Sequence, residues 1–257
     1  MQAFLVVADD MMDESETRRG DICWHRQKSI GLSAINDVLL LRELCENELR
    51  QSFAGDSRQD PVVSSFRKRL LATSIGQALD NDTSRQPSAF SWERYAQIVE
   101  MKTSEYSFVL PLELAALIAE SPQRMNDLCF LARQLGRLFQ AQDDRLDVYG
   151  DQNVTGKIGT DIQDGKCTWL SCAALSRLKD HPCPSRLALF YQHFGRSGNE
   201  SVSVVKGIYD QLGLPDAFSK FETRASLEIE KDIDSLPIPS LRPVLLRVLR
   251  SIQERKK

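Results

Sequence analysis

The chain has 257 residues, of which 42% are hydrophobic and 27% are charged, and its formal net charge is -3. These values are ordinary for a globular protein with one large domain or two small ones. They provide no overall basic field for nucleic acid. We therefore expect no nucleic-acid partner, and we expect any anionic ligand to be held by local cations.

The distribution of cysteine and apolar residues indicates a soluble, cytoplasmic protein. Six cysteines occur without a C-x-x-C spacing, and residues 1–8 lack the basic segment that opens a secretory signal. We interpret the cysteines as reduced intracellular thiols. The longest apolar candidate, around residues 109–119, is interrupted by Pro111 and Glu113. It falls short of the ~20 residues that a membrane span needs, so no span is expected.

Apolar residues recur every three or four positions along nearly the whole chain, which predicts an all-α fold. In chain order, helices are expected over residues 1–14, 31–52, 62–81, 91–120, 122–147, 167–180, 184–195, 200–232 and 238–254. Polar loops are expected at 18–28 and 150–165, and Pro111 is expected to disturb the fourth helix. We expect residues 1–257 to form a single domain.

Two clusters of aspartate interrupt apolar helical segments. The first acidic motif is Asp9, Asp10 and Asp13, and the second acidic motif is Asp143, Asp144 and Asp147. Within each motif the first and last aspartates lie one helical turn apart, on one face. Like charges at this spacing cost a helix roughly 0.2–0.5 kcal/mol per pair, so the repeated pattern favours a bound cation. A solvated, charged helix end is the alternative interpretation of either motif alone.

Together, the two motifs indicate a magnesium site for a phosphate-bearing substrate. Magnesium prefers one or two carboxylates, water and substrate phosphate oxygens over a full cage of protein ligands. Two carboxylate edges that face each other across a cavity are therefore expected to hold a diphosphate between them. The cations available to neutralise it are Arg18, Arg19, Lys102, Lys157 and Lys166.

Longer stretches around both motifs resemble those of the farnesyl diphosphate synthases, which belong to the trans-isoprenyl diphosphate synthase (polyprenyl synthetase) family. Residues 2–20, with their Asp-Asp-Met-Met-Asp and Thr-Arg-Arg-Gly sequences, are similar to the first aspartate-rich region of that family. Residues 139–147 and 155–167 are similar to the second region and the loop after it. The resemblance extends from Met1 to the basic C-terminus.

The resemblance implies an isoprenoid synthase fold, a helical bundle around a central cavity with the two acidic motifs facing each other, and usually a homodimer. It also implies a Mg²⁺-dependent prenyltransferase that condenses isopentenyl diphosphate with dimethylallyl or geranyl diphosphate to give farnesyl diphosphate. By this resemblance the main magnesium ligands are Asp9, Asp13 and Asp143, supported by Asp10, Asp144 and Asp147.

The same resemblance implies roles for the residues that bind the substrates. The allylic diphosphate is expected to be held by Arg18, Lys102 and Lys157, with Lys166 as a further substrate-binding cation. The diphosphate of isopentenyl diphosphate is expected to contact Gln2 and Arg19. The reacting centre is expected to be lined by Lys102, Thr103, Tyr106 and Gln140.

Three features depart from the family pattern. Family members carry further N-terminal helices with a Gly-Gly-Lys motif that grips isopentenyl diphosphate, so we expect this chain to be N-terminally truncated relative to the family. Leu5 stands where an aromatic residue is common. Together with Phe4 it is expected to form the wall that limits product length. Arg145 likewise stands in place of an aromatic residue, inside the second region.

Two other functions remain open on the sequence alone. A terpene synthase derived from this scaffold would ionise an allylic diphosphate and cyclise or quench it without a second substrate. An inactive truncated or regulatory subunit would instead dimerise with an intact copy. Arg19 and the basic tail favour the prenyltransferase, whereas the absent Gly-Gly-Lys motif favours the alternatives.

Overall fold

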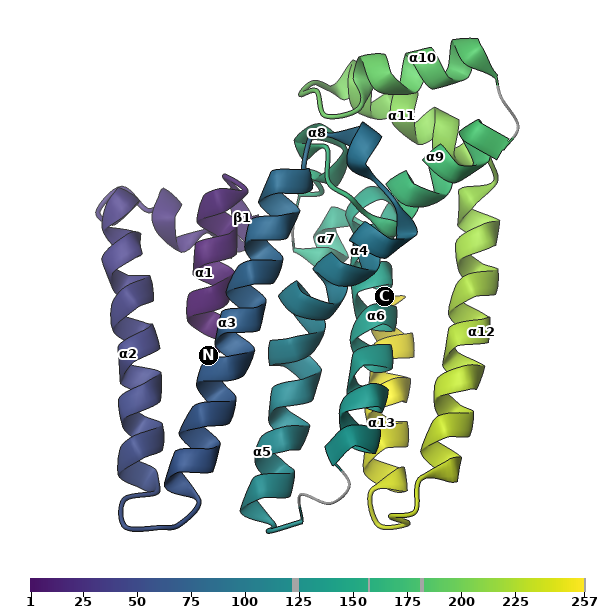
Figure 1. Ribbon diagram of the computed structural model, residues 1–257. Helices are drawn as coiled ribbons and strands as arrows, with labels where there is room; N and C mark the ends of the chain where they lie inside the picture. The colour runs from purple at the N-terminus through teal and green to yellow at the C-terminus, as the bar shows by residue number, and fades with distance from the viewer. Residues whose placement is uncertain (122–124, 157, 181–182, 257) are drawn as a thin grey trace.

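The structure, a computed structural model, describes all residues except 122–124, 157, 181–182 and 257, and it is mostly helical (Figure 1). The longer helices are α1 (Gln2–Met12), α2 (Ala34–Ser52), α3 (Gln59–Thr83), α6 (Met125–Tyr149), α9 (Trp169–Asp180), α11 (Asn199–Gln211), α12 (Leu214–Ser235) and α13 (Arg242–Gln253). The shorter ones are α4 (Trp92–Ile98), α5 (Leu110–Ile118), α7 (Gln152–Thr155), α8 (Asp161–Asp164) and α10 (Pro184–His193). The all-α prediction is confirmed.

Short irregular elements connect these helices. A hairpin of two-residue antiparallel strands, β1 (Thr17–Arg18) and β2 (Asp21–Ile22), lies in the segment predicted as a polar loop. The 3₁₀ turns are η1 (Trp24–Arg26), η2 (Gly31–Ser33), η3 (Pro87–Ala89) and η6 (Glu254–Lys256).

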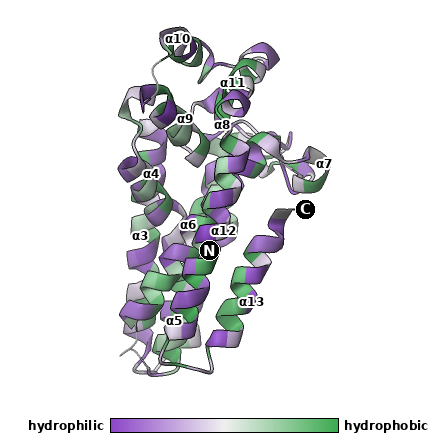
Figure 2. Cartoon of the chain, turned by 90° about the vertical axis from the view of Figure 1, so that its right-hand side faces the viewer, coloured by the Kyte–Doolittle hydropathy of each residue, from purple (hydrophilic) through white to green (hydrophobic). Residues whose placement is uncertain are grey.

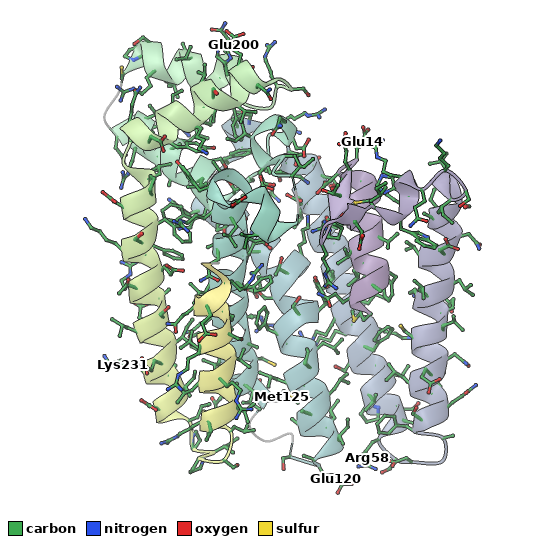
Figure 3. All side chains as sticks on the ribbon, turned by 180° about the vertical axis from the view of Figure 1, so that it is seen from behind. Glu14, Arg58, Glu120, Met125, Glu200 and Lys231 are labelled. Atoms are coloured by element: carbon green, nitrogen blue, oxygen red, sulfur yellow. The ribbon has the colours of Figure 1, made fainter. Side chains whose placement is uncertain are left out.

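Most of the long helices run side by side, and the helices α8 to α11 form a separate group at one end of part of this layer. Figure 1 shows α2, α3, α5, α6, α13 and α12 with roughly parallel axes, and α8 to α11 gathered at the upper right, above α6 and α12. The view from behind shows the same arrangement, with α1 against the upper part of this layer (Figure 3). Figure 2 shows hydrophobic and hydrophilic residues alternating around the helices, as expected for amphipathic helices that share a core.

Separate groups of buried apolar side chains hold the bundle together. One group joins α4, α6 and the helices α9 to α12, and includes Leu170 and Phe218. A second joins α6, α12 and α13 through residues such as Leu135 and Ile233. A third anchors α1 to α3 and α5, because Phe4 packs into it. Thus α1 and α6, which carry the acidic motifs, are both fixed to the same framework.

The segment predicted as one helix over 91–120 consists of α4, an 11-residue π-helix labelled η4 (Val99–Val109), and α5. In a π-helix each N–H bonds to the carbonyl five residues earlier, so the turn is wider than in an α-helix. Pro111, in the first turn of α5, has no N–H to donate to the carbonyl of Ser107. The segment thus departs from one continuous α-helix throughout η4, which ends two residues before Pro111.

The prediction of a continuous helix over 200–232 is wrong. The structure has two helices there, α11 and α12, separated at Gly213, which has a φ of +63°. That left-handed conformation ends an α-helix, and Pro215 in the first turn of the next helix suits a new start. The amphipathic pattern continued through this break and concealed it.

The cysteines and the apolar helices were the subject of two expectations from composition. All six cysteines are free thiols in the structure. Among the residues that the structure describes, no helix is both long enough and apolar enough to cross a membrane.

Candidate active site

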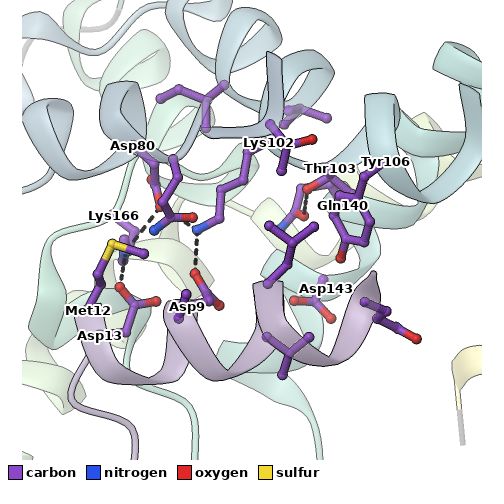
Figure 4. Close-up of a pocket in the computed structure, with 18 of the residues that line it drawn as sticks. Asp9, Met12, Asp13, Asp80, Lys102, Thr103, Tyr106, Gln140, Asp143 and Lys166 are labelled. Atoms are coloured by element: carbon purple, nitrogen blue, oxygen red, sulfur yellow. Dashed lines mark hydrogen bonds and ion pairs between the residues drawn. The ribbon is translucent and has the colours of Figure 1, made fainter. Parts of the chain in front are cut away.

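A cavity of about 850 Å³ lies between α1, α3, η4 and α6 (Figure 4). Asp9 lines it from α1, Asp13 lines it from the C-cap position of the same helix, and Asp143 and Asp147 line it from α6. The two acidic motifs, which are far apart in the sequence, therefore face one shared space. This arrangement confirms the prediction that the motifs lie across a common cavity.

The first acidic motif divides its side chains between two directions. Asp9 and Asp13, four residues apart, lie on the cavity face of α1. Asp10 is 3% exposed and is not part of the cavity lining. It accepts a hydrogen bond of 2.9 Å from Nε of Arg18 and a second, shorter one from Nη2 of the same residue. Asp10 therefore holds Arg18, which itself lines the cavity.

In the second acidic motif all three aspartates line the cavity, but they differ in exposure. The Asp143 side chain remains 42% exposed at the cavity, whereas Asp144 is 3% exposed. Asp144 accepts hydrogen bonds from Oη of Tyr95 at 2.7 Å, the backbone N of Trp169 at 2.8 Å and Nε2 of Gln140 at 2.9 Å. Burial raises the Asp144 pKa to about 7, although these three hydrogen bonds oppose the rise.

Two lysines and three aspartates form a continuous chain of ion pairs along one side of the cavity, which we call the lysine–aspartate chain (Figure 4). Lys102 Nζ lies 3.0 Å from Asp9 Oδ1 and 2.7 Å from Asp80 Oδ2. Lys166 Nζ lies 3.1 Å from the same Asp80 oxygen and 2.6 Å from Asp13 Oδ1. The order along the chain is Asp9, Lys102, Asp80, Lys166 and Asp13.

The ion pairs shift the pKa values of the side chains in the lysine–aspartate chain. Burial by itself raises the Asp9 pKa, but the nearby cations, Lys102 first among them, outweigh burial and lower the pKa to about 2. The Asp80 pKa is also lowered, because Lys102 and Lys166 outweigh its burial. The Asp13 pKa is raised by burial and by the neighbouring Asp9 charge. Burial opposes the charge of Lys102, yet the surrounding aspartates raise its pKa well above the usual value.

The predicted reacting-centre residues are brought together on η4 and α6. Thr103 Oγ1 donates a hydrogen bond of 2.6 Å to Oε1 of Gln140. The other end of the Gln140 amide donates to Asp144, so its orientation is fixed from both sides. Tyr106 lines the cavity one turn further along η4. Together these residues place a hydroxyl, an amide oxygen and a phenol beside the lysine–aspartate chain.

Two cavity residues, Asp80 and Arg255, were not among the residues singled out from the sequence. Asp80 was visible only as an isolated aspartate near the end of α3, and its partners are 22 and 86 residues away. Arg255 belongs to the basic tail. Its guanidinium lies 3.8 Å from the Phe139 ring centroid, and Nη2 lies 3.1 Å from Asp143 Oδ1. A cation thus faces each of the two acidic motifs.

The other predicted substrate and chain-length residues occupy different parts of the site. Gln2, Arg19, Phe4 and Leu5 all line the cavity. Phe4 is only 3% exposed because it also packs into the apolar group that anchors α1, whereas Leu5 is half-buried. The left-handed backbone of Arg19, with a φ of +57°, turns the chain at the β1–β2 hairpin.

Two positions that the sequence singled out, Lys157 and Arg145, are not among the cavity residues named above. Lys157, which is expected to hold the allylic diphosphate, lies outside the residues that the structure describes. Arg145 is not part of the main cavity lining. Its guanidinium carbon lies 5.6 Å from the Phe218 ring centroid, and this cation–π contact accommodates a charged side chain within the bundle.

The donor set fits magnesium. The cavity presents carboxylates from α1 and α6, and hard oxygen ligands from a few carboxylates, completed by water and phosphate, are what this ion prefers. Within the described residues, no three His, Cys, Asp or Glu side chains converge closely enough to hold a metal on their own. The carboxylates instead stand on separate helices and are paired with lysine and arginine.

Comparison with known proteins identifies the family. The profile of the polyprenyl synthetase family matches residues 1–212. The chain is 38% identical over 267 aligned residues to the farnesyl pyrophosphate synthase of Homo sapiens, covering 100% of this chain and 62% of the human protein. It is 35% identical over 262 aligned residues to the farnesyl pyrophosphate synthase of Zea mays, covering 100% of this chain and 74% of that protein. The chain thus spans less than two thirds of the human relative.

Solved structures show the same fold. A T. brucei farnesyl diphosphate synthase complexed with risedronate superposes with a TM-score of 0.87 at 27% identity, covering 99% of this chain and 75% of that one. The T. brucei enzyme complexed with bisphosphonate BPH-1326 gives a TM-score of 0.87 at 29% identity, covering 99% of this chain and 91% of that one. The fold is therefore the isoprenoid synthase fold. Since the family profile also covers most of the sequence, this chain belongs to the polyprenyl synthetase family.

Proposed function

We propose that this protein is a prenyltransferase that condenses isopentenyl diphosphate with dimethylallyl or geranyl diphosphate to give farnesyl diphosphate. The observation that carries the proposal is the joint placement of both acidic motifs and the ammonium groups of Lys102 and Lys166 around one cavity. Carboxylates for a divalent metal and cations for phosphate oxygens are the two groups that a diphosphate leaving group requires.

Each group has a defined part in the proposed reaction. Arg18, Lys102 and Lys166 bind the allylic diphosphate as charged donors, while Asp9, Asp13 and Asp143 hold Mg²⁺. Bound Mg²⁺ supplies Lewis-acid stabilisation of the charge that builds on the departing diphosphate. The carbonyl dipole of Gln140, oriented by Thr103 and Asp144, stabilises the positive charge left on the allylic carbon.

The direct test is turnover of the purified chain with Mg²⁺, geranyl diphosphate and labelled isopentenyl diphosphate. We expect labelled farnesyl diphosphate, and we expect Asp9→Ala and Asp143→Ala to lose at least about 100-fold in kcat while circular dichroism stays unchanged. Asp82→Ala is the matched control, because Asp82 is exposed on α3 and outside the cavity lining.

The same experiment separates the alternatives. A hydrocarbon or terpene alcohol formed without isopentenyl diphosphate would identify a terpene synthase. Absence of turnover together with dimer formation would identify a regulatory subunit. Normal turnover by Asp9→Ala would contradict the metal assignment.

We further propose that the protein forms a homodimer through the outer face of α2. Large apolar side chains are exposed on α2, a helix at the edge of the bundle (Figure 1), and they include Ile35 at 52%, Leu40 at 53% and Leu44 at 52%. Leu32, at 80%, lies just before this helix on η2. Several exposed large apolar side chains on one helix suit an isologous contact with a second copy.

Sedimentation of the purified protein tests the dimer. Leu40→Glu combined with Leu44→Glu is expected to shift the protein to monomer, because two charges would be buried at the contact. Leu227→Glu, on the distant helix α12 at 59% exposure, is the matched control and is expected to leave the dimer intact. A wild-type monomer at micromolar concentration would contradict the proposal.

A further inference from the structure

One carboxylate oxygen serves both lysines of the cavity. Asp80 Oδ2 lies 2.7 Å from Lys102 Nζ and 3.1 Å from Lys166 Nζ. Asp80 is 5% exposed and comes from α3, whereas the acidic motifs come from α1 and α6. It is therefore a third source of negative charge in the site, separate from the carboxylates that face a metal.

The lysines create a competition at the first acidic motif. Lys102 and Lys166 pair with Asp9 and Asp13 at 3.0 and 2.6 Å. While these pairs persist, the two carboxylates are compensated by ammonium groups and are poor ligands for a divalent ion. The same pairs also neutralise the ammonium groups that a diphosphate would need. A metal can coordinate the paired oxygens of Asp9 and Asp13 only after the lysines move away from them, and a diphosphate can bind the ammonium groups only in competition with these carboxylates.

The position of Asp80 offers a way to lower the cost of that release. A lysine that leaves Asp9 or Asp13 still keeps Asp80 as a partner, so it is not left as a buried, unpaired charge. Without Asp80, each lysine would have only one carboxylate partner in the lysine–aspartate chain. The lysine would have to lose that partner before a metal bound.

Asp80 is also held firmly enough to act in this way. It lies on α3 one turn after Gly76, which packs directly against the backbone of Lys102. The glycine brings α3 and η4 together without an intervening side chain. The distance from Asp80 to Lys102 is thus set by helix packing, while the long lysine stem remains free to reorient.

We propose that Asp80 is a positioning residue that retains Lys102 and Lys166 while Asp9 and Asp13 are released to the metal. This inference rests on the proposed function, because it concerns how the same site takes up its metal and its diphosphate. It assigns to Asp80 no contact with the reacting atoms.

The test measures the two ligands separately, without turnover. Binding of Mn²⁺ alone is followed by electron paramagnetic resonance, and binding of inorganic diphosphate alone by calorimetry in the presence of a chelator. For Asp80→Asn we expect Mn²⁺ to bind about tenfold more weakly, because the lysines pair more tightly with Asp9 and Asp13. We expect metal-free diphosphate to bind about tenfold more tightly, because one competing carboxylate is gone.

Two further variants serve as controls for this test. Asp80→Glu keeps the charge one methylene further along the side chain and is expected to restore most of the Mn²⁺ affinity. Asp82→Asn removes the same charge from the exposed side of the same helix and is expected to change neither affinity. In the condensation assay, Asp80→Asn is expected to raise the Mg²⁺ concentration needed for half-maximal rate.

The outcomes separate this inference from the proposed function. If wild type binds neither Mn²⁺ nor diphosphate at millimolar concentration, the proposed function fails. If wild type binds both, and Asp80→Asn weakens both or leaves either unchanged, the role of Asp80 is overturned. Opposite shifts that Asp82→Asn reproduces would also overturn it, since they would reflect net charge alone.

Discussion

Gly76→Ala is expected to damage both the stability of the bundle and its active site. A Cβ built on Gly76 overlaps the backbone nitrogen of Lys102 and lies 2.6 Å from the carbonyl carbon of Met101 and 2.7 Å from Cα of Lys102. These are backbone atoms of η4, so no side-chain rotation relieves the overlap. The helices α3 and η4 must move apart, or one of them must shift along its axis.

The expected magnitude follows from two opposing terms. Overpacking of this kind costs about 1–3 kcal/mol, and replacement of glycine by alanine inside a helix returns about 1 kcal/mol. The net loss is therefore up to about 2 kcal/mol, which corresponds to a fall of up to about 8 °C in the unfolding midpoint for a chain of this size. The movement also separates Lys102 from Asp80, which are now 2.7 Å apart. A displacement near 1 Å at a reacting centre costs up to about 100-fold in rate.

Calorimetric unfolding and steady-state kinetics on the same preparations provide the measurements. Gly207→Ala is the matched control, because Gly207 lies within α11 and a Cβ there meets no atom within 4 Å. That variant is expected to raise the unfolding midpoint, from helix propensity alone, and to leave kcat unchanged. If Gly76→Ala were as stable and as active as Gly207→Ala, the close packing of α3 on η4 would not be what positions Lys102.

Two other variants test separate parts of the structure. Leu5→Phe is expected to shorten the main product, because Leu5 lines the cavity one turn before Asp9; chromatography of labelled products shows this, and Ala3→Phe, on the exposed side of α1, is the control. Glu113→Gln is expected to lower the free energy of unfolding by about 2 kcal/mol at pH 7, because it loses charged hydrogen bonds to Arg69. The Glu113 pKa lies below its usual value because hydrogen bonds from Arg69 and Ser65 outweigh burial, so this contribution is present above about pH 4.5 and fades as the pH falls through the lowered pKa. Urea unfolding of Glu113→Gln and wild type at pH 7 and pH 3 should therefore show a smaller difference at pH 3.

Much of the fold was predictable because its signals are local. Helical periodicity located most helices, since each buries one face against the bundle and is bounded by polar segments. The i, i+4 spacing of Asp9 and Asp13 placed both on one face of α1, and the structure confirms that this face lines the cavity. We expected α1 and α6 to face each other because the sequence around both motifs resembles that of the family.

The parts that were missed depend on contacts between distant segments. Asp80 matters only because α3 brings it to lysines on η4 and on the segment before α9, and no spacing rule predicts such a meeting. The break at Gly213 was hidden because the apolar pattern on both sides has the same period. The π-helical geometry of η4 was likewise not visible, because an α-helix and a π-helix differ in hydrogen bonding more than in composition.

The second aspartate of each motif differs from the first in its surroundings, because it is buried and hydrogen-bonded to other groups of the protein. Asp10, one position after Asp9, is rotated by about 100° around α1 and does not line the cavity, whereas Asp144 lies at the cavity wall but is only 3% exposed. Asp10 accordingly binds Arg18, and Asp144 binds Tyr95, Trp169 and Gln140. Both hold groups that shape the cavity. Each motif therefore combines carboxylates that face the cavity, suited to metal and substrate, with a buried carboxylate that fixes nearby side chains of the cavity wall. These two tasks explain why consecutive aspartates occur at both sites.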